Sequence, residues 1–167
     1  MKRGSIEISF GMIFSIIIII ALIGVAVYAI TAFLDFSDDA QVGLFYEEFQ
    51  NSVNDIFSSA TTNRVISFSV SNSIEFVCFG SIANNIDAGQ YNIQLRALRE
   101  ASSGFQQQNT NTFMYPPEEA GDLAFKKIDK IDLSSLNTFD CFEVEAGKIR
   151  VRLSKGEFES LVKVQHE

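Results

Sequence analysis

The sequence predicts an α+β protein in which an N-terminal transmembrane helix and an amphipathic helix precede a small antiparallel β-sheet domain. Three observations lead to this fold class. No charged residue occurs in residues 8–34, apolar residues recur every three or four positions in residues 38–60, and short runs of alternating polarity occupy much of residues 64–167. These are the patterns of a membrane span, of a helix with one buried face and of half-buried strands.

Residues 8–34 form the predicted transmembrane helix. Five consecutive isoleucines, Ile16 to Ile20, leave no polar face for water. A helix crosses the hydrocarbon of a bilayer with about 20 residues, and this segment is longer than that. Positive residues stay on the cytoplasmic side of a span. Because Lys2 and Arg3 precede it, we expect residues 1–7 to be a cytoplasmic n-region and residues 35–167 to be an extracytoplasmic domain on the cell membrane.

The span is predicted to remain on the mature protein as a signal-anchor. A cleaved secretory signal has an apolar core of about 7–15 residues, followed by a cleavage site of small residues. Here the core is longer, and the exit Thr31-Ala32-Phe33-Leu34-Asp35 contains no A-x-A pattern.

The start of the chain resembles the class III signal peptide of archaeal type IV pilins and archaellins, because Lys2-Arg3-Gly4 is followed directly by Ser5 and a long apolar helix. The resemblance covers about the first 35 residues and implies a lollipop, pilin-like architecture. It also implies that a peptidase cuts after Gly4, so that the mature chain begins at Ser5 and its helix packs in the core of a filament. The chain is also similar to small archaeal single-pass membrane proteins that begin K-R-G-x-x-E-I-S-F-G-M-I-F-S.

Glu7 departs from the pilin pattern and has two interpretations. Pilins commonly carry Glu at the fifth mature position, which is Ser9 here, whereas Glu7 would be the third. Glu7 could make a subunit contact by neutralising the new α-amino group of a neighbouring copy. Alternatively, it is a first-turn carboxylate that suits the helix dipole at the level of the lipid headgroups.

The charge of the exported part excludes nucleic acid as an expected partner. The chain has 13 basic and 21 acidic residues. Two basic residues and one acidic residue precede the span, which leaves 11 basic and 20 acidic residues, or a net charge of −9, in residues 35–167. An acidic surface repels phosphate backbones. The expected partners are the lipid bilayer and either further copies of the chain, through the N-terminal helix, or another envelope protein.

A second helix is expected over residues 38–60, after a break at Asp35–Asp38 where Ser37 or Asp38 can cap it. Its apolar stripe consists of Val42, Phe45, Phe49, Val53, Ile56 and Phe57. The stripe packs on the sheet of its own domain or continues a subunit contact that the anchor begins.

Several shorter elements follow, and together with the hairpin below they form a β-rich head over residues 64–167. Strands are predicted over residues 66–70 and 74–79, with a turn at Ser71-Asn72-Ser73. A capping box at Asp87 and Gln90 begins a helix over residues 88–101. Residues 102–112 are a polar loop, residues 122–136 suit either strand or helix, and a last strand covers residues 158–165.

A C-terminal hairpin is predicted from residues 141–145 and 148–153, which alternate in polarity on either side of Ala146-Gly147. Pairing Glu145 with Lys148 also pairs Glu143 with Arg150 and Phe142 with Val151, so that one face carries opposite charges and the other is apolar.

Cys78 and Cys141 are the only cysteines, and in an exported domain two thiols often form a disulfide. The bridge would require Cα atoms within about 7 Å, which places their strands side by side or across one layer. The alternative is two buried free thiols, since Cys141 falls on the charged face of the predicted hairpin.

The sequence offers little for catalysis, so we expect no enzyme activity, no cofactor and no metal. His166, the only histidine, lies next to the C-terminal residue and is expected to be solvated. Phosphate-binding glycine motifs are absent from the sequence. Four acidic clusters lack the EF-hand spacing and are interpreted as a solvated acidic face. They are Asp38/Asp39, Glu47/Glu48, Glu118/Glu119/Asp122 and Asp129/Asp132.

Three functional hypotheses follow. The first is a membrane-anchored envelope protein with a non-catalytic interaction domain, and the second is a pilin-like filament subunit processed after Gly4. The third, an exported enzyme, is disfavoured by the lack of catalytic residues.

Overall fold

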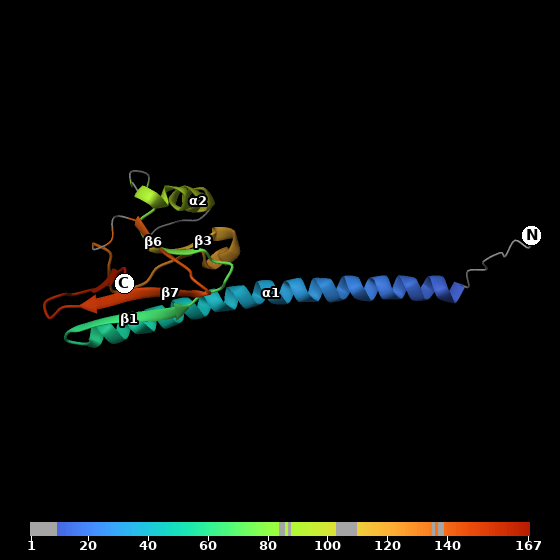
Figure 1. Ribbon diagram of the computed structural model, residues 1–167, viewed down its shortest axis with the longest axis horizontal. Coiled ribbons are helices and arrows are strands. Elements are labelled where there is room, and N and C mark those ends of the chain that lie inside the picture. The colour runs from blue at the N-terminus through green and yellow to red at the C-terminus, as the bar shows by residue number, and fades with distance from the viewer. Residues whose placement is uncertain (1–9, 84–85, 87, 103–109, 135, 137–138) are drawn as a thin grey trace, which may run out of the picture. The chain divides into compact units, whose positions relative to one another are not determined.

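The structure is a computed structural model that describes residues 10–83, 86, 88–102, 110–134, 136 and 139–167. It has the predicted α+β class, with a long apolar N-terminal helix and sheets that are largely antiparallel (Figure 1). The chain forms two compact units, Met1–Ser37 and Asp38–Glu167. We call the second unit the head. The boundary between the units falls three residues from the predicted start of the exported domain.

One helix, α1, runs from Phe10 to Ser58. The predicted break at Asp35–Asp38 is therefore wrong, because these residues continue the helix. Asp and Ser in a helix interior each cost only a few tenths of a kcal/mol relative to Ala. No glycine or proline, which cost more, occurs between Ala32 and Gln41 to end the helix.

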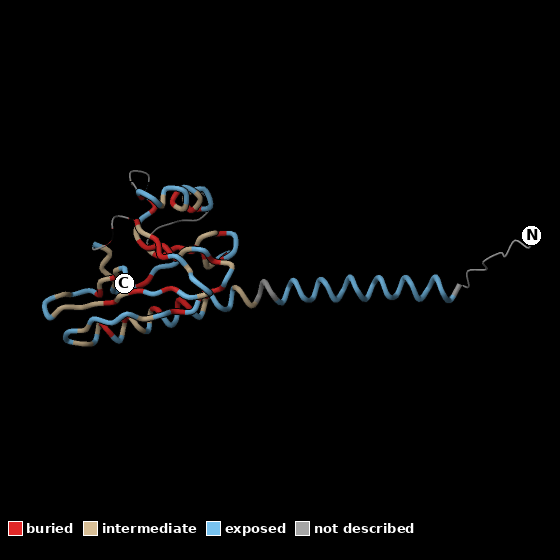
Figure 2. Tube along the Cα trace, in the orientation of Figure 1, coloured by how far each residue is buried: buried red, intermediate tan, exposed pale blue. Residues whose placement is uncertain are grey.

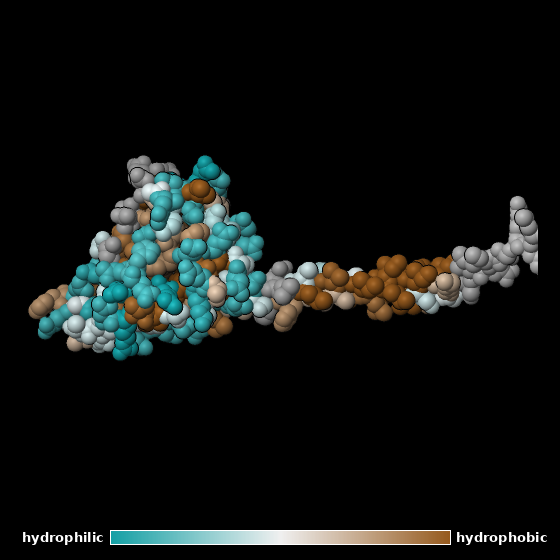
Figure 3. Space-filling view, in the orientation of Figure 1, coloured by the Kyte–Doolittle hydropathy of each residue, from teal (hydrophilic) through white to brown (hydrophobic). Residues whose placement is uncertain are grey.

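The first part of α1 exposes its apolar side chains. Every residue from Gly11 to Phe33 is exposed (Figure 2), and these residues make an almost continuous hydrophobic surface (Figure 3). In the part of the chain that the structure describes, α1 is the one helix long and apolar enough to cross a membrane. The helix is thus compatible with the predicted transmembrane or signal-anchor segment.

The head contains two four-stranded sheets. Sheet A has the order β1 (Thr62–Ser69), β7 (Lys148–Lys155), β8 (Val162–Gln165) and β5 (Ile131–Asp132). Sheet B has the order β4 (Phe125–Lys126), β3 (Thr112–Tyr115), β2 (Phe76–Gly80) and β6 (Phe139–Glu143). Neighbouring strands are antiparallel except β5 and β8, which are parallel.

Short helices complete the head. They are η1 (Gly89–Tyr91), α2 (Asn92–Ser102), α3 (Pro117–Ala120) and η2 (Gly121–Leu123). The helix predicted over residues 88–101 thus corresponds to η1 and α2, while its capping residue Asp87 lies outside the described residues. Arg99 on α2 donates to the carbonyl oxygens of Ile82 at 3.0 Å and Ile86 at 3.3 Å, which ties the helix to the segment that leaves β2.

The main core lies between the second half of α1 and the inner faces of both sheets. The predicted stripe on α1 is buried there, except for Phe57, which is half-buried. Aromatic rings connect the elements: the ring centroid of Phe49 lies 5.0 Å from that of Phe68 on β1 and 5.3 Å from that of Phe79 on β2. The stripe therefore packs within its own domain, which was one of the two predicted alternatives.

A smaller second core lies on the opposite face of sheet B. Leu95 and Leu98 of α2 pack there with Cys78, Phe113 and Phe139. Sheet B is therefore covered on both faces. Sheet A is covered on one face, and Ser67, Ser69 and Arg150 on its other face are exposed.

The predicted C-terminal hairpin is wrong beyond its first pair. Glu145 faces Lys148 as predicted, but β6 then pairs with β2 and β7 pairs with β1 and β8. The two strands belong to different sheets because β6 has apolar side chains on both faces, with Phe142 in the main core and Cys141 in the second core. A hairpin with one solvated face could not bury both. Arg150 forms an ion pair with Glu167 at 3.5 Å.

Two other predicted elements differ from those in the structure. The ambiguous residues 122–136 contain the end of η2 and the two-residue strands β4 and β5. The last strand begins at Val162, whereas residues 158–161 belong to the turn after β7. Phe158 was expected in that strand, but its side chain is 97% exposed in the turn.

Candidate functional site

The processing and topology residues predicted at the N-terminus lie outside the described residues. These are Lys2, Arg3, Gly4, Ser5 and Glu7. The positions of the cleavage site, of the topology-determining charges and of the subunit contact at Glu7 therefore stay predictions.

Cys78 and Cys141 form a disulfide, which was one of the two predicted alternatives. They lie directly opposite each other on the antiparallel strands β2 and β6, with Cα atoms 3.9 Å apart. Both are fully buried in the second core beneath α2. The charged face that made Cys141 an awkward partner belonged to the hairpin that does not form.

His166 is not simply solvated as expected. Its Nε2 atom lies 3.0 Å from Oδ2 of Asp140, and its ring stacks on Phe142 with centroids 4.1 Å apart. Asp140 also accepts a hydrogen bond from the main-chain N–H of Cys141 at 2.9 Å. These contacts fix the C-terminal residues beside β6, although the His166 side chain is still about half exposed.

The acidic residues are dispersed over the head. Asp38 accepts a hydrogen bond from the Ser71 hydroxyl at 2.7 Å, Asp129 forms an ion pair with Lys127 at 2.8 Å, and Glu47 and Glu48 are exposed. Among the described residues, no group of three or more His, Cys, Asp or Glu side chains could hold a metal ion.

Several hollows mark the surface of the described part of the head. One, of about 670 Å³, lies where β6 and β7 separate and is lined by both acidic and basic residues, including Glu143, Glu145 and Arg150. A second, of about 520 Å³, lies between η1 and β6 beside Tyr91 and the His166–Asp140 pair. Their walls are mainly polar.

Two further hollows flank α1. A groove of about 510 Å³ runs between α1 and Ser69 of the edge strand β1, with the exposed Leu44 and the carboxylates of Glu47, Glu48 and Asp55 on its walls. A smaller hollow of about 330 Å³ lies on the other side of Glu47. Its walls are Gly43, Tyr46, Glu47, Gln50, Lys126, Lys127 and Ile128.

Three features of this surface were missed by reasoning from the sequence. The contact of Asp140 with His166 was not predicted because the two residues are 26 positions apart in the sequence. Gly43 sits inside a helical pattern, where a glycine costs about 1 kcal/mol relative to alanine and usually has a packing or functional reason. The glycine inside the helical pattern could therefore have marked this position from the sequence alone. Phe158 fitted the alternation of a strand, and no local pattern distinguished it from a core residue.

Comparisons of the chain with protein-family models, with curated proteins and with solved structures give no match. The function is therefore argued from the apolar half of α1, the disulfide-linked head and its surface.

Proposed function

We propose that this chain is a membrane-anchored extracytoplasmic protein whose head is an interaction domain. The observation that carries the proposal is the contrast along α1. Residues Gly11–Phe33 expose an apolar surface that water disfavours, while the second half of the same helix is buried in a head with its own core. The disulfide supports export, because such bonds persist in oxidising compartments.

An interaction domain is favoured over an enzyme by the chemistry of the head. A nucleophilic mechanism needs a hydroxyl or thiol within hydrogen-bonding reach of a base. Among the described residues, the side-chain hydrogen bond of His166 goes to Asp140, and both cysteines are in the disulfide. The surface instead offers hollows and exposed apolar side chains such as Phe158 and Leu44.

Protease accessibility in spheroplasts tests this proposal. We expect the head to be digested from outside while the N-terminus stays protected. Replacing Lys2 and Arg3 together by Glu removes the positive charges at the cytoplasmic end and should leave a fraction of the heads inside. Arg64→Glu, on the exported β1, is the matched charge change and should leave the orientation intact. A head that is protected in the unaltered chain would overturn the proposal.

The second candidate is a filament subunit processed after Gly4. It is favoured by one observation, the helical assignment of α1 from Phe10 to Ser58 without interruption. The resemblance to type IV pilins covers only about the first 35 residues, and it implies that the apolar helix stays on the mature chain and packs in the core of a filament. A single helix that joins this apolar stretch to the buried stripe of the head supports such a subunit.

N-terminal sequencing of the mature protein separates the two candidates. A chain that begins at Ser5 supports the filament subunit, and a chain that begins at Met1 contradicts it. Gly4→Leu should then block processing. If Glu7 makes a subunit contact, Glu7→Gln should lower the yield of filaments while processing continues. If Glu7 serves only the helix dipole, the yield should stay within about twofold of the unaltered chain.

A further inference from the structure

The turn between β7 and β8 presents an apolar side chain to solvent. The Phe158 side chain is 97% exposed. Acidic residues flank it on both sides. Glu157 is exposed, and Glu159 is held by Lys163 and by the main-chain N–H of Gly156. A phenylalanine side chain that is almost fully exposed does not contribute to the hydrophobic core of the head. The turn is therefore an apolar knob with a negative rim.

The smaller hollow beside α1 has complementary properties. Its floor includes Tyr46 and Ile128, which are each 2% exposed, and its rim carries the exposed Lys126 and Lys127. Lys126 Nζ lies 5.3 Å from the centroid of the Tyr46 ring, so a cation already lies against an aromatic surface there. Of the four hollows described, this one has more Lys and Arg than Asp and Glu in its lining.

Gly43 gives an independent indication that this hollow receives a side chain. The packing of the head does not require the glycine, because a Cβ atom there would meet only Leu123 Cδ1, at an ordinary 3.9 Å. Its backbone is that of the α1 interior, where alanine is more favourable. Because Gly43 has no side chain, the wall of the hollow stays open, and a side chain from another molecule has room to enter.

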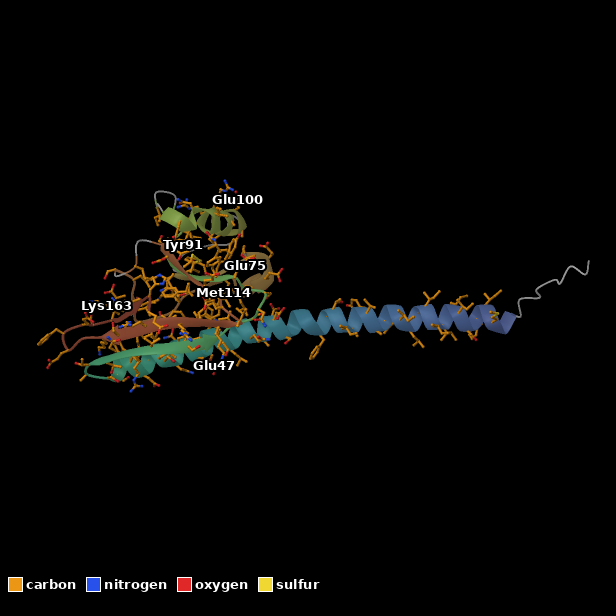
Figure 4. The ribbon with its side chains drawn as sticks, viewed as in Figure 1. Glu47, Glu75, Tyr91, Glu100, Met114 and Lys163 are labelled. Carbon is orange, nitrogen blue, oxygen red and sulfur yellow. A yellow bond between two sulfur atoms is a disulfide. The ribbon has the colours of Figure 1, made fainter. Side chains whose placement is uncertain are left out.

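Knob and hollow cannot meet within one head. Figure 1 shows the turn after β7 at the left end of the head, whereas Gly43 and Glu47 belong to the part of α1 where the head begins. In Figure 4, Glu47 is labelled toward the side where α1 enters the head. Lys163, which pairs with Glu159, is labelled toward the side of the turn after β7. A contact between the two surfaces must therefore join two copies.

We propose that Phe158 of one copy inserts into the hollow formed by Gly43, Tyr46 and Lys126–Ile128 of a second copy, so that heads associate head to tail. The phenylalanine ring would rest on Tyr46 and Ile128 beside the Lys126 ammonium, in a cation–π arrangement. Glu157 would approach Lys127, whose exposed pair with Asp129 is inexpensive to exchange. Knob and hollow are different surfaces, so the contact is heterologous and propagates into a ring or a chain of subunits.

A second copy fits the knob better than a lipid surface does. Glu157 and Glu159 beside the ring would be repelled by anionic headgroups, while the lysine rim of the hollow attracts them. The inference rests on the proposed role of the head in interactions. It requires neither processing at Gly4 nor assembly through the apolar helix, so it can fail while the topology proposal stands.

Photocrosslinking of the full chain in its own membrane tests the contact. The change Phe158→benzoylphenylalanine keeps an aromatic ring at the knob. On illumination we expect a covalent dimer, at least tenfold above the same probe at Ile93, an exposed apolar residue on α2. Mass spectrometry should place the adduct within residues 43–50 or 126–128 of the second copy. No dimer above the Ile93 level, or an adduct on lipid or on another surface, would overturn the proposal.

Three further variants make the test independent of a single result. Gly43→Leu closes the hollow and should reduce the crosslink to the Ile93 level. Glu157→Lys, on an exposed turn that leaves the core untouched, should weaken it severalfold, and adding Lys127→Glu should restore it. A crosslink that survives Gly43→Leu, or a charge exchange that fails to restore it, contradicts the proposed contact. Protease accessibility of the same chains shows separately whether the head is exported.

Discussion

Lys155 donates a hydrogen bond from its ammonium group to the main-chain carbonyl of Phe57, and the same Nζ atom lies 4.9 Å from the centroid of the Phe57 ring. It also donates to the carbonyl of Ser59 at 3.3 Å. The last carbonyls of a helix have no partner within the helix and carry its negative dipole end. Lys155, at the end of β7, therefore satisfies the C-terminus of α1 from sheet A.

Removing this cation should destabilise the head. We expect Lys155→Met to lower the free energy of unfolding by about 1–2 kcal/mol, because carbonyls at the helix end lose a charged donor. Thermal or urea unfolding of residues 36–167 measures the effect. Lys127→Met is the control, since its exposed ion pair with Asp129 is worth less than about 1 kcal/mol. Equal effects of the two changes would argue against a role for Lys155 at the helix end.

Residues 36–167 should fold without the anchor. The main core is built entirely from residues 42–164, and the disulfide lies within the same unit. We expect this shortened chain to be soluble and to show one cooperative melt by circular dichroism. A chain that has native-like helix content but no cooperative transition would show that the head depends on the first 35 residues.

The disulfide should contribute strongly to stability. It joins residues that are 63 apart in the sequence, which on the chain-entropy model is worth about 4 kcal/mol. Cys78→Ala combined with Cys141→Ala should lower the free energy of unfolding by roughly that amount. Thiol titration of the denatured, unreduced chain should find no free thiol. Two titratable thiols would contradict the bridge.

Single substitutions at two adjacent residues of the turn between β6 and β7 should change the stability of the head in opposite directions. Ala146 has a φ of 50°, which is unfavourable for a residue with a Cβ atom. Ala146→Gly should therefore stabilise the head by about 0.5–1 kcal/mol. The control Ala101→Gly, on the exposed face of α2, should have the opposite sign because glycine weakens a helix.

Gly147→Ala tests the other half of the same turn. The φ of Gly147 is 71°, and a Cβ atom there would lie 2.8 Å from Oδ1 of Asn72 and 3.3 Å from the carbonyl oxygen of Val70. We expect a loss of about 1–3 kcal/mol in the free energy of unfolding. A neutral result would mean that the segment carrying Asn72 can move away without cost.

Acid should weaken the head through two carboxyl groups near β8. Hydrogen bonds from the main-chain N–H and the hydroxyl of Ser134 hold the pKa of Asp132 below its ordinary value. The Lys163 ammonium and the main-chain N–H of Gly156 do the same for the pKa of Glu159. Both groups therefore contribute stability above the unfolded pKa of about 4, and it is lost as pH falls through the lower folded pKa values.

The measurement is the free energy of unfolding between about pH 6 and pH 2. Asp132→Asn and Glu159→Gln should each make the free energy of unfolding decline less steeply as the pH falls. The Lys163 pKa is raised by the same Glu159, so its contribution is complete below the unfolded pKa of about 10.4 and declines only at higher pH. A decline that is unaffected by either substitution would assign the acid sensitivity to other groups.

The predictions from sequence succeeded where a pattern reflects one physical constraint. The stripe from Val42 to Ile56 is set by burial on one side of a helix. The disulfide was one of two alternatives for the two cysteines of a domain that is predicted to be exported. The helix break after the span was wrongly predicted because the polar residues at 35–38 stop a helix only weakly. The hairpin failed because the alternation of β6 shows which residues are buried but not which strand lies beside them.

The candidate surface could be predicted less well. A hollow such as the one at Gly43 and Lys126 joins residues that are 83 positions apart, and no local pattern connects them. Phe158 differs from core phenylalanines only by its position at the tip of a turn. The boundary of β8 decides that position, and boundaries depend on tertiary packing.

The bridge across β2 and β6 also determines how the head would respond to a pulling force. If tension is applied between the α1 side and the C-terminus, the load passes directly from Cys78 to Cys141 through the sulfur atoms. The 63-residue separation between them is then excluded from extension. At about 3.4 Å per residue, this withholds roughly 210 Å of contour length. Only the segments outside the closed loop, which include β1, β7 and β8, can lengthen until a reductant cuts the bond.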